Sequence, residues 1–205
     1  MTRNLRAACG AAAMLAAAAA PVPAAADQGD ILARVRLLSI QPDTSASNTL
    51  SALGAGANNS IVPELDFTWM ATANLGLELI LGTTRNTVTS NLGTLGRVGI
   101  LPPTLTLQWH FNPQGRIRPY VGAGLNYTLF YNNSLQAGGQ HVGITNHSFG
   151  PAFQAGVDVQ VTKKLFVNAD IKKIYMRTDA TLDGQPLGTL KLDPWVFGIG
   201  VGMTF

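Results

Sequence analysis

The sequence predicts an all-β fold, an eight-stranded antiparallel transmembrane β-barrel of the outer-membrane type, and three observations support it. First, the last stretch of the chain alternates between large apolar and mostly small residues, which is typical of a strand whose two faces meet different surroundings. Second, the chain begins with the features of an export signal. Third, strand-like segments are separated alternately by short turns and long polar segments. In the last stretch the large residues are Trp195, Phe197, Ile199, Val201, Met203 and Phe205, and between them stand Val196, Gly198, Gly200, Gly202 and Thr204.

The small residues of this last strand are the informative ones. A soluble sheet with one wet face would carry Lys, Glu or Ser at these positions, whereas this strand carries mostly glycine. An apolar outer face and little volume on the inner face suit the wall of a small transmembrane barrel. The chain also ends on Phe205, and a terminal aromatic residue after alternating apolar residues is similar to the signal read by the barrel-assembly machinery. We therefore expect Phe205 to be an assembly signal and that machinery to be a partner.

Residues 1–26 are expected to be a secretory signal peptide, and residues 27–205 a single transmembrane β-barrel domain. Arg3 and Arg6 precede an alanine-rich run, and an A-x-A cleavage site ends at Ala26. The run is shorter than the ~20 apolar residues that a spanning helix needs, so an N-terminal membrane anchor is disfavoured.

Removal of this signal changes the bulk composition. Arg3 and Arg6 leave, so the formal net charge falls from +3 to +1, and nothing points to a nucleic-acid partner. The single cysteine, Cys9, leaves as well, which excludes disulfides, cysteine catalysis and thiolate metal sites. No stretch of ~18 apolar residues remains for a transmembrane helix. We expect no cofactor and no metal.

The rest of the chain divides into eight strands of about ten residues. Short turns alternate with long segments rich in Ser, Asn and Gly, which are expected to be loops. Because outer-membrane barrels keep their short turns in the periplasm, an even strand number leaves both termini there. The expected strands are 31–40, 61–71, 75–83, 104–111, 118–130, 147–161, 165–177 and 195–205, and the expected long loops are 41–60, 84–101, 131–146 and 178–190.

Aromatic residues fall at both ends of these strands, as in the interfacial girdles of membrane barrels. We expect Trp69, Trp109, Phe111, Phe166 and Phe205 near the short turns, and Tyr127, Tyr131, Phe149, Tyr175 and Trp195 near the long loops.

The alternation assigns a lumen-facing side to each strand. In the first strand Arg34 and Arg36 must face the lumen, because a charge facing mid-bilayer lipid costs ~2–4 kcal/mol. Since strand direction alternates, each inward residue also has a height. The inward residues nearer the outside are apolar: Leu38, Ile40, Val62, Ile80, Phe130, Ile174, Met176 and Leu192. The deeper ones form a polar plug that includes Arg34, Arg36, Asp66, Glu78, Arg118, Asp158 and Asp170.

This arrangement suggests an apolar funnel above a charged floor. The interior of an eight-stranded barrel is about wide enough for its own side chains, so the charged residues should pair and block water and ions. A small hydrophobic solute would then leave sideways into the bilayer. Pro63, Pro151 and Pro194 are candidate exits, because proline cannot donate to a neighbouring strand. Alternatively, these prolines mark strand ends or the extracellular rim, and the apolar cluster is a packed barrel top.

Four segments carry a family resemblance: residues 101–111 (LPPTLTLQWHF), 118–128 (RPYVGAGLNYT), 155–158 (AGVD) and 193–202 (DPWVFGIGVG). With them the chain resembles the OmpW family of outer-membrane proteins, which includes the AlkL-type alkane importers. The resemblance implies an eight-stranded barrel in the outer membrane of a Gram-negative bacterium, with a narrow apolar channel for small hydrophobic molecules. Outer-membrane lipid and lipopolysaccharide are the expected surroundings.

Other functions remain open. Some eight-stranded outer-membrane barrels are lipid-modifying enzymes, and His147 and Ser148 are candidates for a base and a nucleophile. Adjacent strand residues point to opposite faces and do not pair, so we expect no enzyme. His141 and His147 without carboxylate support are a weak metal site. A structural or receptor barrel that acts through its extracellular loops is the second alternative. A lipocalin-like soluble barrel is disfavoured, because it would place apolar rather than charged residues inside.

Overall fold

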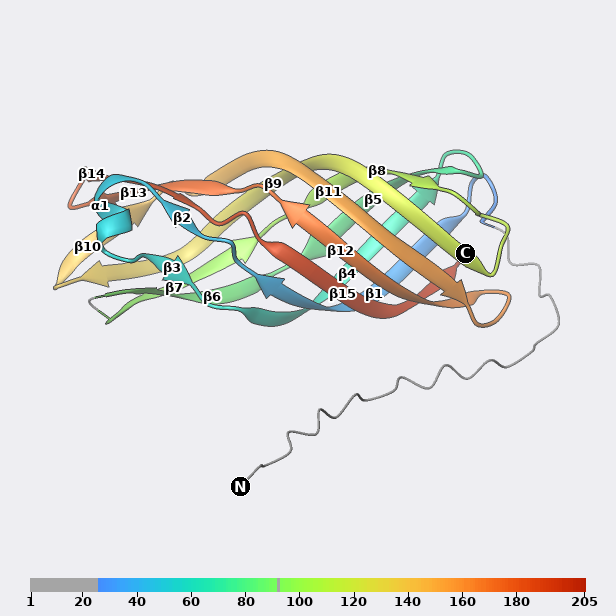
Figure 1. Ribbon diagram of the computed structural model, residues 1–205, viewed down its shortest axis with the longest axis horizontal. Helices are drawn as coiled ribbons and strands as arrows, with labels where there is room; N and C mark the ends of the chain where they lie inside the picture. The colour runs from blue at the N-terminus through green and yellow to red at the C-terminus, as the bar shows by residue number, and fades with distance from the viewer. Residues whose placement is uncertain (1–25, 92) are drawn as a thin grey trace, which may run out of the picture.

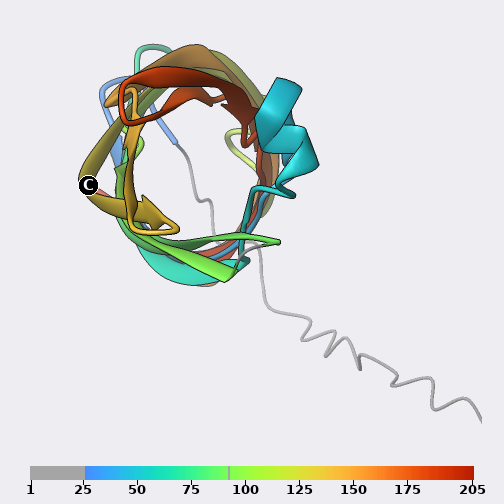
Figure 2. The same ribbon diagram turned by 90° about the vertical axis from the view of Figure 1, so that its left-hand side faces the viewer.

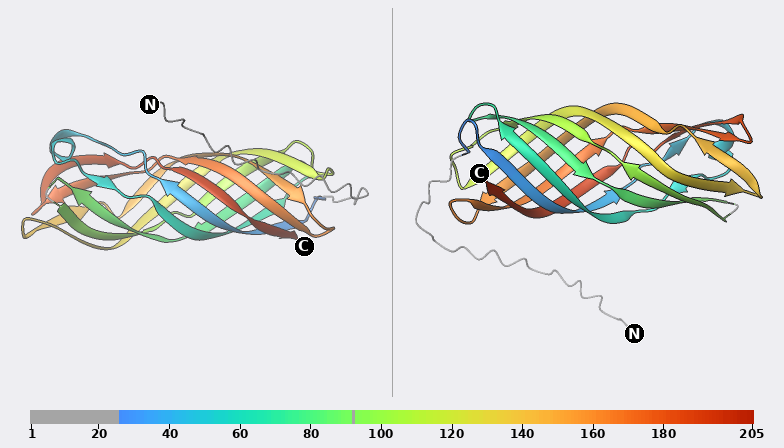
Figure 3. Two further views of the ribbon diagram at one scale, coloured as in Figure 1. Left: turned by 60° about the horizontal axis from the view of Figure 1, so that its bottom comes forward. Right: turned by 180° about the vertical axis from the view of Figure 1, so that it is seen from behind.

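The computed structural model describes residues 26–91 and 93–205, so residues 1–25 of the expected signal peptide lie outside the described part. The described chain is a long cylinder of strands that are inclined to its axis (Figures 1 and 3). Viewed from one end, the strands form a closed ring (Figure 2). Within the described residues, no helix is long and apolar enough to cross a membrane.

Eight antiparallel strands close the cylinder, as predicted. Neighbours in the chain pair in turn, and the ring is completed where the first strand meets the last one over Leu32↔Thr204 to Gln41↔Trp195. The strands are β1 (Ile31–Gln41), β4 (Ser60–Met70), β5 (Leu75–Gly82), β8 (Thr104–His110), β9 (Ile117–Ala137), β11 (His147–Gln160), β12 (Leu165–Ile174) and β15 (Trp195–Thr204).

The segments expected to be long loops are largely β-structure, and that expectation was wrong. They form a β-walled extension at one end of the cylinder, at the left of Figure 1. The extension lacks a lipid-facing stripe, so the apolar alternation that marks the other strands is missing there, and its Gly and Asn residues resemble loop composition. Its strands are β6 (Thr84–Ser90), β7 (Gly93–Leu101), the upper part of β9, β10 (Gln140–Ile144), β13 (Arg177–Leu182) and β14 (Gln185–Lys191).

The segment between β1 and β4 closes the rim of this extension. β2 (Ser45–Ala46) pairs with β14, β3 (Gly56–Ala57) pairs with β6, and the short helix α1 (Asn48–Ala52) lies between them. Figure 2 shows α1 at the outside of the ring. The opposite end carries the short turns and the C-terminus (Figure 1).

The outer wall of the cylinder is apolar. Inside, one level along the axis carries polar side chains and another carries apolar ones. Ile199 is 67% exposed and Leu125 54% exposed on the outer wall, whereas Arg34 is fully buried inside. A soluble protein has the opposite arrangement, with apolar side chains inside and charged ones outside. The burial of these residues confirms the predicted facing of the strands. Phe166 was wrongly placed in the outer girdle, because it points inward on β12 and is buried.

Glycines on β15 let it lie close to β1. A Cβ added to Gly200 would stand 2.8 Å from the Cα of Arg36 and closer still to the carbonyl oxygen of Val35. The inner face of β15 therefore leaves room for the long side chains of β1.

Candidate functional site

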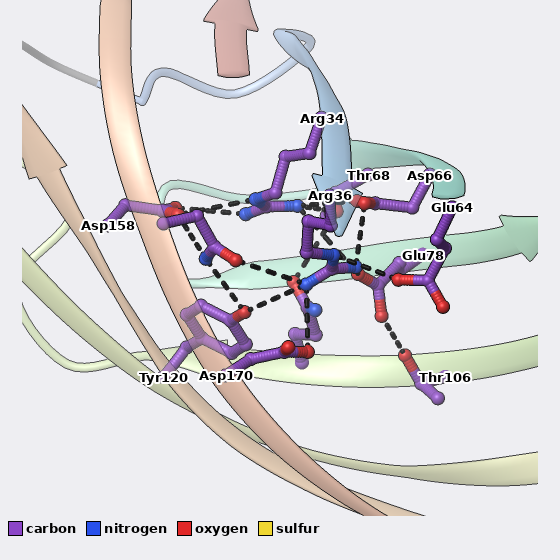
Figure 4. A network of polar contacts seen from close by, with 12 residues as sticks. Arg34, Arg36, Glu64, Asp66, Thr68, Glu78, Thr106, Tyr120, Asp158 and Asp170 are labelled. Carbon is purple, nitrogen blue, oxygen red and sulfur yellow. Dashed lines mark hydrogen bonds and ion pairs between the residues drawn. The ribbon is translucent and has the colours of Figure 1, made fainter. Parts of the chain in front are cut away.

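The lumen has two levels, and the lower one is a layer of charged side chains. We define the polar layer as the cations Arg34, Arg36, Arg118 and Lys172 with the carboxylates Glu64, Asp66, Glu78, Asp158 and Asp170. All of these residues are buried. Charges without solvent are tolerated only when they are paired and hydrogen-bonded. Figure 4 shows how the two arginines of β1 extend into the centre of this layer.

Arg34 joins opposite walls of the barrel. Its Nε and Nη2 donate to the two carboxylate oxygens of Asp158 on β11 at 3.2 and 2.9 Å. Its Nη1 donates to Asp66 at 3.0 Å and to Thr68 at 2.7 Å on the neighbouring β4. Such two-pronged Arg–carboxylate pairs are strong and directional.

Arg36 contacts carboxylates on three strands. Its guanidinium lies 2.9 Å from Glu64, 2.6 Å from Asp66, 3.0 Å from Glu78 and 2.8 Å from Asp170. These contacts connect β4, β5 and β12 across the lumen, so they block it with fixed side chains.

Two members of the layer were not among the predicted plug residues. The Nζ of Lys172 lies 3.0 Å from Glu64 and 2.6 Å from Asp170. The alternation places Glu64 and Lys172 inward, so the signal that would have found them was present. They stand at the upper edge of the layer, where it meets the apolar level.

Arg118 lies below the other cations. It is buried, its Nη2 is 4.0 Å from Asp158, and its guanidinium stands over the ring of Phe166 at 4.9 Å. Beneath it, Ala26, Leu32, Met70 and Phe166 form a small apolar cluster. The turn end of the lumen is therefore filled by side chains as well.

The upper level is apolar, and the residues predicted to line it meet there. Leu38, Phe130, Ile174, Met176 and Leu192 belong to one buried cluster, and Ile40 and Val62 pack against it. Ile80 is buried and lines a cavity with Leu38 and Val62. The cluster continues into the extension through Val98, Ile100, Leu135, Val142 and Leu190.

Three small cavities follow one another through this level. The lowest, of about 40 Å³, touches Glu64 of the polar layer. The middle one, of about 50 Å³, shares Ile40 and Ile174 with it. The uppermost, also about 50 Å³, shares Ile100 and Leu192 with the middle one. Each has room for a few water-sized molecules only, so a larger molecule has to displace side chains.

The regular strand pairing of the barrel wall has a break beside the middle cavity. Backbone bonds still cross it, from the N–H of Tyr175 to Pro151 at 3.0 Å and from the N–H of Leu192 to Met176 at 2.9 Å. β12 ends at Ile174 and β13 begins at Arg177, and β14 and β15 are interrupted at the same level. Here the backbone N–H of Met176 donates to the side chain of Asp193 at 3.0 Å, in place of a regular ladder bond. We call this break the seam. On its outer side lies a depression of about 370 Å³, lined by Phe149, Gly150, Pro151, Tyr175, Met176, Arg177, Lys191 and Asp193.

The candidate prolines differ in their relation to the seam. Pro151 lines the outer depression, and Pro194 lines the middle cavity of the lumen. Pro63 is exposed on the outer wall opposite Leu37 of β1 and lines none of these cavities. The structure therefore brings Pro151 and Pro194 to one place and leaves Pro63 apart.

The residues weighed as catalytic or metal-binding do not form a site. His147 faces outward and stacks on Tyr127, whereas Ser148 is buried and its hydroxyl accepts a bond from the backbone of Arg177 at 2.9 Å. Among residues 26–91 and 93–205, no three or more His, Cys, Asp or Glu residues are grouped to hold a metal ion.

An apolar outer wall, a charged lumen and a closed antiparallel ring define an outer-membrane β-barrel. The OmpW family model matches residues 27–205, and the chain belongs to this family. It is 42% identical over 184 residues to the uncharacterized outer-membrane protein y4mB of Sinorhizobium fredii, with 84% of this chain and 78% of that protein covered. It is 35% identical to outer membrane protein W of Escherichia coli, with coverage of 87% and 90%.

A solved structure has the same architecture. The outer membrane protein OprG of Pseudomonas aeruginosa superposes with a TM-score of 0.79 at 25% identity, covering 90% of this chain and 99% of that one. The protein is therefore located in the outer membrane of a Gram-negative bacterium. Since such barrels keep short turns in the periplasm, the β-walled extension is extracellular.

Proposed function

We propose that this protein provides a narrow apolar route for small hydrophobic molecules, which leave the lumen sideways into the outer membrane. The observation that carries the proposal is the position of Met176. This residue lines both the middle cavity of the lumen and the depression on the outer wall. Movement of Met176 and of the wall beside it is the proposed way in which the two spaces join.

The proposed entry is the extracellular extension. Apolar side chains continue from the extension down to the level of Leu38, and the residues that line the upper and middle cavities include no charged one. The upper cavity is lined by Val98, Phe130, Leu135 and other apolar residues, with Asn86 and Thr178 as its polar members. A hydrophobic molecule would gain about 25 cal/mol for each Å² of apolar surface that it buries there.

The polar layer opposes passage into the periplasm. Below Glu64 a hydrophobic molecule would have to separate Arg36 from its carboxylates. Breaking a buried ion pair costs several kcal/mol, and the apolar molecule offers the ions nothing in return. The cost of crossing the polar layer supports the proposed lateral path.

The seam suits such a path. Met176 is unbranched and adapts its rotamer to irregular spaces. Around it, Pro151 donates no backbone hydrogen bond, and the N–H of Met176 bonds to a side chain rather than to a neighbouring strand. Opening of the wall at this point would break the bond from the N–H of Leu192 to Met176 and that from the N–H of Tyr175 to Pro151, but no continuous ladder.

Uptake of a small apolar fluorescent probe tests the proposal. It would be followed in Gram-negative cells with and without the protein, together with the ion conductance of the purified protein in planar bilayers. We expect faster uptake and little ion current. Equal uptake with and without the protein would contradict the proposal and would favour a barrel that acts through its extracellular surface.

A further inference from the structure

Two cations face each other on the outer wall above the seam. Arg177 on β13 and Lys191 on β14 are direct cross-strand partners, and both side chains are exposed. Like charges directly opposite one another destabilise a sheet. Within the described residues, neither side chain has an ion pair or a hydrogen bond. An arrangement of this kind gains stability when an anion binds between the two cations.

Both cations line the outer depression, with aromatic side chains beside them. Phe149 and Tyr175 form part of its wall, and Asp193 is its acidic member. The Oδ1 of Asp193 already accepts the N–H of Met176 at 3.0 Å, and among the ion pairs of residues 26–91 and 93–205 none joins Asp193 to either cation. The depression thus offers two free positive charges next to apolar surface.

The level of the depression is the membrane interface. Tyr175 precedes Arg177 by two positions on the outer face, and Trp195 stands across from Lys173 on the adjacent strand. The Nζ of Lys173 lies 4.8 Å from the Trp195 ring and is paired with Asp43 at 3.1 Å. Tyr and Trp are enriched where lipid chains meet headgroups. Arg177 and Lys191 lie just beyond them, on the extracellular side.

We infer that the depression binds a phosphate of the lipid A headgroup in the outer leaflet. The planar guanidinium of Arg177 would donate hydrogen bonds to the phosphate oxygens, and the ammonium group of Lys191 would add a compact positive charge. The acyl chains would then run down the outer wall over Phe153 and Phe197, which are 51% and 42% exposed. This site does not depend on solute passage through the lumen.

Native mass spectrometry of the purified full-length mature protein in detergent tests the site. The probe is diphosphoryl lipid A, compared with the same lipid after chemical removal of its phosphates. The double variant Arg177→Gln/Lys191→Gln should bind diphosphoryl lipid A about thirtyfold more weakly, since each cation near a lipid surface contributes about 1 kcal/mol. The matched control is Lys163→Gln/Lys164→Gln in an exposed turn at the other end, which should bind like the unaltered protein.

Several outcomes would overturn the inference. They are equal affinity of the Arg177/Lys191 variant and the unaltered protein, equal binding of the dephosphorylated lipid, and displacement of lipid A by 10 mM inorganic phosphate. The last would mean that the cations hold free phosphate rather than a lipid. Uptake of the apolar probe by the same variant separates the two proposals. Loss of lipid binding with normal protein-dependent uptake supports the lipid site and shows that the channel works without it. Normal lipid binding by the unaltered protein without any protein-dependent uptake rejects only the channel.

Discussion

Arg34 and Asp158 lie 124 positions apart in the chain and on strands that are not neighbours, yet their side chains meet through two parallel hydrogen bonds of 3.2 and 2.9 Å. The pair spans the lumen at the level where an apolar cavity would otherwise continue toward the periplasm. The barrel is thus fastened from inside as well as through its backbone ladder. The stability of the barrel and the closure of its lumen depend on the same residues.

The first prediction concerns this fastening. Arg36→Met removes a cation that four buried carboxylates share, Glu64, Asp66, Glu78 and Asp170. It should lower the free energy of unfolding by about 3–5 kcal/mol, because Arg34 and Lys172 are then the only cations left beside them and the buried negative charge is no longer balanced. Urea unfolding in lipid vesicles measures this. Arg97→Met, at an exposed position of β7, is the control and should change stability by less than about 0.5 kcal/mol. Similar stability of both variants would show that the layer does not hold the walls together.

The second prediction concerns the apolar level. Phe130→Asp places a charge among the residues that line the upper cavity, and it should abolish protein-dependent uptake of an apolar probe while the barrel still folds. Phe130→Leu keeps the position apolar and should retain uptake. Far-ultraviolet circular dichroism establishes folding of both variants. Undiminished uptake by the folded Asp variant would mean that the apolar level is only a packed barrel top.

The third prediction concerns the seam. Met176→Ala shortens the side chain of a residue that lines both the middle cavity and the outer depression, so uptake of the apolar probe should become faster. Met176→Asp should abolish uptake, because the probe would have to pass a carboxylate. Met70→Ala, a buried methionine in the cluster at the turn end, is the matched control and should leave the uptake rate unchanged. Equal effects at Met70 and Met176 would place the exit elsewhere.

The fourth prediction concerns the closing strands. Gly200→Ala would bring a methyl group against the backbone of β1, and forced packing of this kind costs about 1–3 kcal/mol. Gly82→Ala is the control, because its nearest neighbour would be the carbonyl oxygen of Pro63 at an ordinary 3.7 Å. Gly200→Ala should therefore lower the free energy of unfolding more than Gly82→Ala does. An unaffected Gly200→Ala barrel would show that β1 and β15 can separate slightly without loss.

The sequence was sufficient to predict the membrane-spanning part of the fold. In a bilayer every outward position must be apolar, so the alternation along β5 or β15 identifies both the strand and its inner face. In the extension the outer face meets water, and this constraint is absent. β6, for example, reads as Thr-Arg-Asn-Thr-Val-Thr-Ser, and only its pairing with β7 and β3 shows that it is a strand.

The sequence predicted at which level of the lumen the site residues lie, but it did not predict which of them are in contact. Alternation and strand direction placed Arg34, Asp66 and Asp158 together, and their ion pairs agree with that placement. The seam was beyond prediction, because it arises where two strand pairs are interrupted side by side, at Tyr175 and at Asp193, which are far apart in the sequence.

The position of the two arginines on β1 has a consequence for assembly. β1 is hydrogen-bonded to β4 and β15, yet Asp158 and Asp170 reach its arginines from β11 and β12. Those contacts exist only when the sheet has curled into a complete ring, since in an open sheet β1 and β11 lie at a distance. β15, the strand that must join β1 to seal the ring, contributes glycines and no charge at this level. The ion pairs therefore form only after the last strand has docked on the first. They distinguish the closed barrel from every partly closed precursor.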